Sequence, residues 1–353
     1  MTGTRSACIE VPTSSSPRVS VIIPATASQD LLLAALQSLA RHGPPRIPFE
    51  VIVVLNRSSP AAAADLSARV MGVRVVPSAV NLGLAGAANR GRTEATGELL
   101  IILHDDAEVE PGWMEALVTA ADSHPEAGVI GGKVLHPDGT LQNAGMILWR
   151  DASSSPPWSG DPPPPTAFDD VRCVDYCGTS SLLVRADVWD AVGGLDERFY
   201  PLYYVDVDLA MSVRRLGLVV LYEPASRIRH HSGASSSVRW RSFVLARNRR
   251  LFVEKWAGVL DQHEPCDVRD IAATARAMAR TARRDRPDGR VAAAAPLPQP
   301  EVAELPPPDG CYIEMERDVT DAYVQWLTAT LDNVEHQLGL AAAASPPVDG
   351  HRT

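Results

Sequence analysis

The sequence predicts an α/β domain in which helices cover both faces of a mostly parallel sheet. Between residues 19 and 122, short runs of Val, Ile and Leu alternate with amphipathic stretches of helical length. The runs are continuously apolar, which is typical of parallel strands that are buried on both faces. Ligands bind beyond the carboxyl ends of such strands, so the polar residues that follow each run are candidates for a site.

The first half of the chain alternates strands with helices. Continuous apolar runs predict strands at residues 19–23, 50–55, 73–76 and 99–103. Amphipathic stretches predict helices at residues 31–40, 61–70, 84–95 and 111–120. The last of these is expected to open at Pro111, because proline suits the first turn of a helix.

The second half is more mixed in pattern. Strands are expected at residues 129–130, 146–149, 181–184 and 218–222, and helices at 187–192 and 206–216. Residues 153–165 are rich in Ser and Pro. Consecutive prolines remove backbone donors and fix φ, so we expect no regular structure there but a surface loop.

The character of the chain changes after residue 260. We expect a helix at 268–283, a Pro/Ala linker of polyproline type at 292–308, and an amphipathic helix at 318–338. The apolar face of that last helix either packs back on the domain or forms a dimer contact. The expected organisation is a flexible N-terminus (1–18), a main domain (19–260, with halves 19–125 and 126–260), a helical extension (261–290), a Pro-rich linker (291–310), a C-terminal helix (311–340) and a tail (341–353).

Composition narrows the class of protein. The net charge of −10 argues against nucleic-acid binding, which needs a basic surface. No stretch approaches the roughly 20 apolar residues that cross a bilayer, and the N-terminus lacks the apolar centre of a secretory signal, so we expect a cytoplasmic protein. Five cysteines make a disulfide framework improbable. Cys173 and Cys177 lack two further ligands at zinc spacing.

Two acidic pairs stand where elements begin or end. Asp105 and Asp106 follow the apolar run at 99–103, where carboxylates can hold a divalent cation; the alternative is a solvated turn or helix cap. Asp206 and Asp208 open a predicted helix, where acids stabilise the helix dipole by about 0.3–1 kcal/mol. The aromatic residues at 199–204 form an apolar wall that raises a carboxyl pKa, which suits Asp206 as a general base.

Histidines and glycines add further candidates. His230 and His231 follow a short strand-like segment, and imidazole beside a carboxylate suits Mn²⁺, so either histidine is a metal-ligand candidate. The glycine-rich run from Asn81 to Gly91 opens a helix whose amides can meet a phosphate. The dinucleotide-binding fingerprint is missing after the first strand, which disfavours an oxidoreductase.

In their order along the chain, these segments resemble inverting glycosyltransferases of family 2, which have the GT-A fold. The resemblance runs from about residue 19 to 260. It rests on the segments 19–24, 50–54, 81–91, 103–106, 111–113, 137–140, 193–199, 206–209 and 230–233. The segment from Asn248 to Ala257 is similar to the polysaccharide-building branch, which includes rhamnosyltransferases.

The resemblance implies a role for individual residues. Asp106 matches the last acid of the Asp-x-Asp motif and would bind metal with His230, whereas His104 stands where the first acid is usual. Asp206 matches the catalytic base, although Val205 replaces the glutamate before it. The donor-binding residues implied are Pro24, Ala25, Asn56, Gly83, Asn89, Arg90, Asp105, Asp106, Gly178 and Thr179. Trp149, Trp158 and Asp208 are assigned to the acceptor side. Leu55 replaces the aspartate that usually reads the nucleotide base.

The implied activity is transfer of a sugar from a nucleoside diphosphate sugar, of UDP or dTDP type, to an acceptor hydroxyl with Mn²⁺ or Mg²⁺ as cofactor. The acceptor would be a glycan, a lipid-linked glycan or a small molecule. The alternatives are a degenerate GT-A binding or scaffolding subunit, and a nucleotidyltransferase. Residues 238–255 carry six basic side chains and one acid among aromatic residues. This segment either contacts a membrane surface peripherally or packs on the domain.

Overall fold

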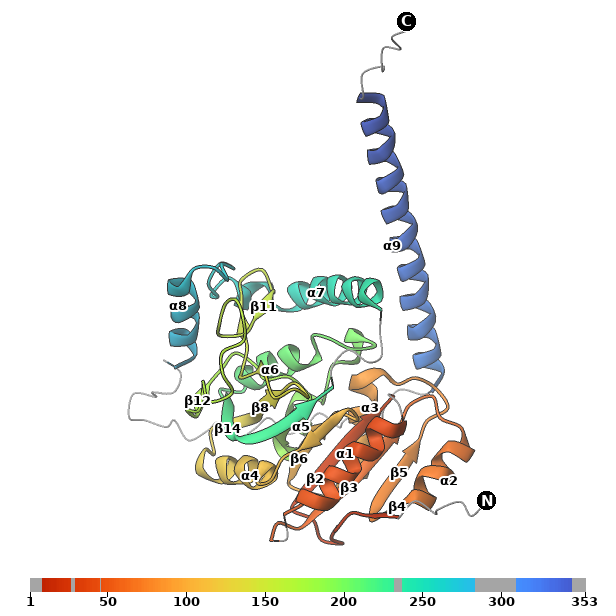
Figure 1. The fold of residues 1–353 in the computed structure, drawn as a ribbon, viewed down its shortest axis with the longest axis vertical. Helices are drawn as coiled ribbons and strands as arrows, with labels where there is room; N and C mark the ends of the chain where they lie inside the picture. The colour runs from red at the N-terminus through yellow and green to blue at the C-terminus, as the bar shows by residue number, and fades with distance from the viewer. Residues whose placement is uncertain (1–7, 27–28, 45, 232–236, 283–308, 345–353) are drawn as a thin grey trace, which may run out of the picture.

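The computed structural model describes residues 8–26, 29–44, 46–231, 237–282 and 309–344, and its centre is a ten-stranded sheet (Figure 1). One half of the sheet is parallel, in the order β5 (Val73–Pro77), β3 (Phe49–Leu55), β2 (Val19–Ala25) and β6 (Leu99–Leu103). These are the predicted strands of the first half. The helices between and after them are α1 (Gln29–His42), α2 (Pro60–Arg69), α3 (Gly83–Glu94) and α4 (Trp113–Ser123).

The second half of the sheet is mixed. β13 (Ser181–Arg185) runs antiparallel between β6 and β8 (Ala127–Leu135), and β14 (Val219–His230) runs parallel to β8. Shorter strands complete the sheet: β7 (Ala107–Val109), β9 (Leu141–Asn143) and β12 (Arg172–Cys173). Because β8 is antiparallel to β13 and β13 to β6, the strands β2, β3, β6 and β14 end at the same edge of the sheet.

Alternate residues of each strand face two separate cores. Ile22, Ile52 and Leu100 pack under α3, α5 (Ala186–Val192), α6 (Val205–Arg215) and α7 (Val238–Leu260). Val21 and Ile101 pack on the opposite face, under α1 and α4. Both faces are therefore covered, which confirms the predicted fold class.

Three local predictions are wrong. α4 begins at Trp113 rather than Pro111, because Gly112 has a φ of 81° that a helix cannot contain. Within 153–165, the two residues of β11 (Ser154–Ser155) pair with β10 (Ile147–Leu148); they precede the prolines and keep their amide donors. The N-terminus is ordered at β1 (Ile9–Glu10), which pairs with β4 (Val70–Met71), and Val11 is buried.

The C-terminal helices pack on the main domain. α8 (Ile271–Ala282) contributes Ala273 and Ala277 to a small core with Ile147 and Trp149. α9 (Asp309–Ala344) starts before and ends after the predicted bounds, and it leads away from the body of the molecule (Figure 1). The linker at 292–308 and the tail from 345 lie outside the described residues. None of the described helices has both the length and the apolar character that a membrane span requires.

The apolar face of α9 packs against α7 of the same chain. Tyr323 and Trp326 contact Trp240 and Phe243 with ring centroids 4.9–5.9 Å apart, and Val319 is buried in the same cluster. The alternative that this helix packs back on the domain is therefore confirmed. This packing covers part of the apolar face of α9, and a dimer contact through the helix stays a prediction. The aromatic side chains Trp240 and Phe243 of α7 pack in the same cluster, and peripheral membrane contact of this helix stays a prediction.

Candidate active site

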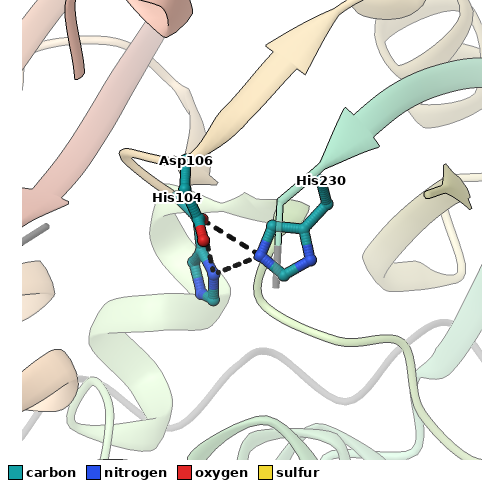
Figure 2. Close-up of side chains that lie close together, drawn as sticks. All are labelled: His104, Asp106 and His230. Carbon is teal, nitrogen blue, oxygen red and sulfur yellow. Dashed lines mark hydrogen bonds and ion pairs between the residues drawn. The ribbon is translucent and has the colours of Figure 1, made fainter. Parts of the chain in front are cut away.

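Three side chains converge where β6 and β14 end. His230 Nε2 lies 3.1 Å from Asp106 Oδ1, and His104 Nδ1 lies 3.2 Å from His230 Nε2 and 3.9 Å from Asp106 Oδ1. Figure 2 shows the three groups pointing toward one another. They form the one cluster of metal-ligating side chains found among the described residues.

The chemistry of this cluster fits a divalent ion. Two imidazoles and one carboxylate are ligands that suit Mn²⁺ and similar transition metals. Ligand atoms bound at about 2.1 Å from one ion lie roughly 3.0–3.4 Å apart, close to the separations seen here. Burial, together with the neighbouring His230, lowers the pKa of His104 to about 4, so this imidazole is neutral at pH 7, as a ligand must be. Burial raises the pKa of Asp106, but the hydrogen bond to His230 and the interactions with the His230 and His104 rings together outweigh it, so the pKa is lowered.

The strand register decides which of the two adjacent histidines joins the cluster. β14 pairs antiparallel with β7, and His230 lies opposite Ala107, directly after Asp106. The next residue points elsewhere: His231 Nε2 lies 3.0 Å from Glu108 Oε1. Gln142 fixes the ring of His230, because its Oε1 accepts from Nδ1 at 2.8 Å and leaves Nε2 facing Asp106. Of the two histidines left open by the sequence, His230 is the ligand candidate.

His104 is the residue that sequence reasoning undervalued. His104 stands where the resemblance expects an acid. Its imidazole, two residues before Asp106, nevertheless reaches the same cluster as Asp106 and His230. Thr179 holds it from the other side, with Oγ1 3.1 Å from His104 Nε2. The signal in the sequence is the position of His104, which directly follows the apolar run at 99–103. Gln142 gave no signal, because it lies 88 residues from its partner His230.

Asp206 lies in the same cavity as this cluster. A cavity of about 380 Å³ is lined by His104, His230, Asp206, Gly178 and Thr179, among others. Burial raises the pKa of Asp206 to about 6, although a hydrogen bond from the backbone N–H of Val207 opposes the shift. A carboxylate with this pKa is a suitable general base near neutral pH. The sequence predicts a raised pKa for Asp206 beside the aromatic residues at 199–204, and this direction is confirmed.

The backbone just before Asp206 is strained. Tyr203 and Tyr204 have φ values of 69° and 68°. A non-glycine residue in this left-handed region costs about 1–2 kcal/mol. Both tyrosines line the cavity. Such strain persists only where the surrounding structure enforces it, and it is concentrated at functional sites.

The predicted donor residues fall into two groups. Gly178 and Thr179 line the cavity. Asp105 is buried and directly follows the lining residue His104; its Oδ2 accepts from the backbone N–H of Thr26, which follows Pro24 and Ala25 at the end of β2. These positions agree with a ligand site at the carboxyl edge.

The other predicted donor residues hold the framework. Asn56 accepts from the N–H of Leu82 and donates to the carbonyl of Gly83, so its amide fixes the start of α3. Asn89 exchanges hydrogen bonds with both backbone groups of Leu195. The side chain of Arg90 is exposed. Asn56 and Asn89 are therefore positioned by the protein itself rather than offered to a ligand.

The acceptor-side assignments do not agree with the structure. None of Trp149, Trp158 and Asp208 is among the residues that line the cavity. Trp149 is fully buried under α8 and donates to Ser155, whereas Trp158 packs on Phe168. Asp208 is 3% exposed and is bound by α7. A side chain without accessible atoms cannot meet an acceptor, so Trp149 and Asp208 are removed from that role.

Comparisons with known proteins agree with this geometry. Residues 20–189 match the model of glycosyl transferase family 2. The chain is 31% identical over 236 residues to the O-antigen biosynthesis protein RfbC of Myxococcus xanthus, covering 64% of this chain but 18% of that protein. It is 27% identical over 230 residues to the N-acetylglucosaminyl-diphospho-decaprenol L-rhamnosyltransferase of Mycobacterium tuberculosis (strain ATCC 25618 / H37Rv), covering 58% of this chain and 74% of that enzyme.

Solved structures show the same fold. The crystal structure of GalNAc-T7 with UDP, GalNAc and Mn²⁺ aligns with a TM-score of 0.53 at 16% identity, covering 69% of this chain and 48% of that one. The mixed α/β sheet is thus of GT-A type, as the resemblance implied. Residues 20–189 therefore form a glycosyltransferase domain of family 2, and the relatives of the chain include proteins named for O-antigen biosynthesis and rhamnosyl transfer.

Proposed function

We propose that this chain transfers a sugar from a nucleoside diphosphate sugar to an acceptor hydroxyl, with inversion at the anomeric carbon. One observation carries the proposal: the carboxylate of Asp206 and the group formed by His104, Asp106 and His230 meet at one cavity. A base and an anion-binding centre in one cavity are what displacement of a diphosphate requires.

The reaction would be a single in-line displacement. The acceptor oxygen forms a bond to the anomeric carbon while the bond from that carbon to the diphosphate oxygen breaks. Asp206 takes the proton from the acceptor hydroxyl, and the nucleoside diphosphate leaves with the bonding electrons. General base catalysis supplies about 10²–10⁴-fold, so positioning and charge stabilisation must supply the rest.

His104, Asp106 and His230 would hold the divalent cation. Bound there, Mn²⁺ or Mg²⁺ offsets the charge that grows on the leaving diphosphate. Two imidazoles favour Mn²⁺ over Mg²⁺, which prefers oxygen ligands. The Mn²⁺ in the GalNAc-T7 structure supports this choice.

The donor side is supported by Gly178, Thr179 and Asp105, which lie at or beside the cavity. A UDP- or dTDP-linked sugar is proposed, in keeping with the UDP of GalNAc-T7 and with a rhamnosyltransferase relative. The acceptor is proposed to be a glycan or a lipid-linked glycan, since the names of both curated relatives concern such molecules.

A donor screen tests the proposal. The purified chain is incubated with Mn²⁺ and UDP-glucose, UDP-N-acetylglucosamine, dTDP-rhamnose or GDP-mannose, and release of nucleoside diphosphate is measured with water as the acceptor. We expect turnover with at least one donor, loss of turnover in Asp206→Asn, and retained donor binding in that variant. No turnover with any donor would favour a scaffolding subunit. Pyrophosphate release in a parallel reaction, supplied with a nucleoside triphosphate and a sugar 1-phosphate, would favour a nucleotidyltransferase.

A further inference from the structure

We propose that α7 fixes the position of the start of α6, and that Asn248 and Lys255 are positioning residues for Asp206. The inference rests on the proposed function, because it assigns to these residues the placement of the proposed base. Both belong to the 248–257 segment, which the sequence singled out and the reaction itself does not use.

Asn248 holds the segment that leads into α6. Its side chain is completely buried, and Nδ2 donates to the carbonyls of Phe199 and Leu202 at 2.8 Å and of Tyr203 at 3.2 Å. Its Oδ1 accepts from Arg247 Nη1 at 2.7 Å. Both polar atoms of this amide therefore have hydrogen-bond partners. The amino group donates only to carbonyls of the backbone that precedes Asp206.

These bonds act where the backbone is strained. Tyr203 and Tyr204 adopt left-handed conformations directly before Val205, the first residue of α6. Tyr204 is also anchored through its hydroxyl, which donates to the carbonyl of Ala152 at 2.9 Å. Without the donors of Asn248, the carbonyls would lose the partners that enforce this geometry, and the segment could relax to a lower-energy backbone.

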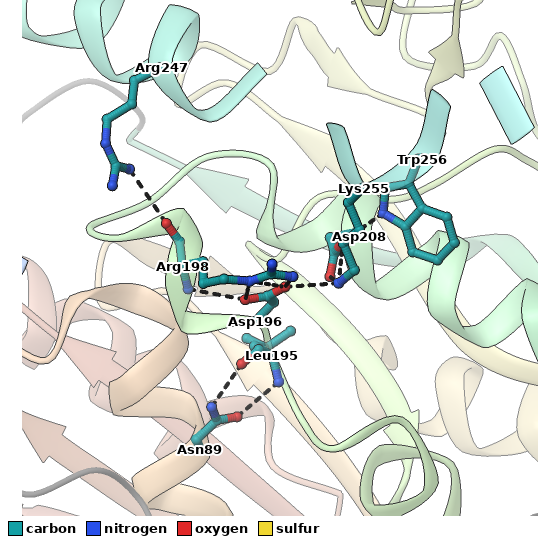
Figure 3. A network of polar contacts seen from close by, with 8 residues as sticks. All are labelled: Asn89, Leu195, Asp196, Arg198, Asp208, Arg247, Lys255 and Trp256. Atoms are coloured by element: carbon teal, nitrogen blue, oxygen red, sulfur yellow. Dashed lines mark hydrogen bonds and ion pairs between the residues drawn. The ribbon is translucent and has the colours of Figure 1, made fainter. Parts of the chain in front are cut away.

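Lys255 binds the first turn of α6 through Asp208. Its Nζ donates to Asp208 Oδ2 at 2.9 Å and to Asp196 Oδ2 at 2.8 Å, and lies 2.8 Å from Asp208 Oδ1 (Figure 3). Trp256 Nε1 donates to Asp208 Oδ1 at 2.7 Å, and Arg198 binds both oxygens of Asp196. Two cations and two carboxylates thus form a charge-balanced group. Burial raises the pKa of Asp208, and the hydrogen bonds from Lys255 and Trp256 oppose that shift.

The two aspartates of α6 face different parts of the molecule. Asp206 lines the cavity, whereas Asp208, two residues on, points to α7. Residues two apart on a helix face opposite sides. Anchoring Asp208 therefore fixes the rotation of the first turn, and with it the direction in which Asp206 faces.

The test uses the donor of the panel above that is turned over fastest with Mn²⁺, at saturating Mn²⁺. Asn248→Leu removes the donors at similar volume, and Lys255→Met removes the charge. We expect kcat to fall at least tenfold in each, while the KM for the donor changes less than threefold, because the group that would hold the diphosphate is untouched. Arg18→Met is the matched control: Arg18 also bridges two carboxylates, Glu98 and Asp122, but at the start of β2. It should leave kcat unchanged.

Rescue separates positioning from folding. Lys255→Arg should recover most of kcat. The double variant Lys255→Met, Asp208→Asn should be at least threefold faster than Lys255→Met alone, because it removes the buried unpaired carboxylate. Folded content is checked by circular dichroism, and if Asn248→Leu does not fold, this double-variant cycle decides the matter.

The outcomes distinguish the inference from the function on which it rests. Unchanged kcat in Lys255→Met, or an equal loss in Arg18→Met, would overturn the positioning role of α7 while leaving Asp206 as the proposed base. Full activity in Asp206→Asn would instead overturn the proposed base. A rise in donor KM with kcat unchanged would assign α7 to donor binding and would also contradict its positioning role.

Discussion

Burial raises the pKa of the Asp206 carboxyl to about 6, and this value sets the pH range in which the residue can accept a proton. A base works only when deprotonated, so we expect kcat to fall below about pH 6, tenfold for each further pH unit, and to level off above pH 7. The measurement is a pH–rate profile at saturating donor and Mn²⁺.

The control for this profile is Asp206→Asn. Its residual rate should lack the acidic limb near pH 6, since the titrating group is gone. If the limb persists in this variant, it belongs to another group, and Asp206 is not the base.

Gln142 governs the ring of His230. Its Oε1 accepts from Nδ1 at 2.8 Å, so the lone pair of Nε2 is directed at the metal cluster. Removing such a partner from a metal-ligating histidine weakens metal binding by about 10–100-fold. We therefore expect Gln142→Leu to lower Mn²⁺ affinity by this factor in isothermal titration calorimetry. An unchanged affinity would show that the ring needs no such support.

Among the helices, α9 is fixed to the main domain near its first turn by the buried side chain of Tyr312, in addition to its contacts with α7. Tyr312 is 2% exposed, and its ring lies so close to Gly86 of α3 that a Cβ there would come within 2.7 Å. Its hydroxyl donates to Glu197 Oε2 at 2.7 Å. We expect Tyr312→Ala to lower the free energy of unfolding by about 3–5 kcal/mol, and Tyr312→Phe by about 1.5–3 kcal/mol.

Urea unfolding of the two variants checks this prediction. Tyr312→Phe keeps the ring and serves as the control for packing. If both variants unfold at the urea concentration of the parent protein, α9 does not contribute to the stability of the domain.

The strands could be predicted from the sequence, but some side-chain roles could not. The run at 99–103 is apolar throughout, so no other placement than a buried strand satisfies it. The burial of Trp149 and Asp208 cannot be predicted from their local sequence, because the helices that cover them, α8 and α7, follow much later in the chain. The choice between His230 and His231 depends on the register of β14 with β7, which composition does not encode.

For the chain as a whole, the site results from topology. β6 and β14 end at one edge and β13 begins there, so His104, Thr179 and His230 meet although 126 residues separate the two histidines. α6 then delivers Asp206 to the same cavity, and α7 closes on α6 from the far side. The sheet thus positions the candidate metal ligands, while the later helices position the proposed base.

Metal binding should therefore stabilise the entire fold, because the cluster exists only when these segments are assembled. An ion at 100 times its Kd adds about 2.7 kcal/mol, which corresponds to a rise in Tm of about 5–10 °C for a domain of this size. We expect this rise with Mn²⁺ and its reversal by EDTA in differential scanning calorimetry. Asp106→Asn and His230→Ala should abolish the shift. His231→Ala is the matched control, since His231 is the adjacent residue but faces Glu108. A lost shift in His231→Ala, or a full shift in His230→Ala, would contradict the assignment of His230 to the metal.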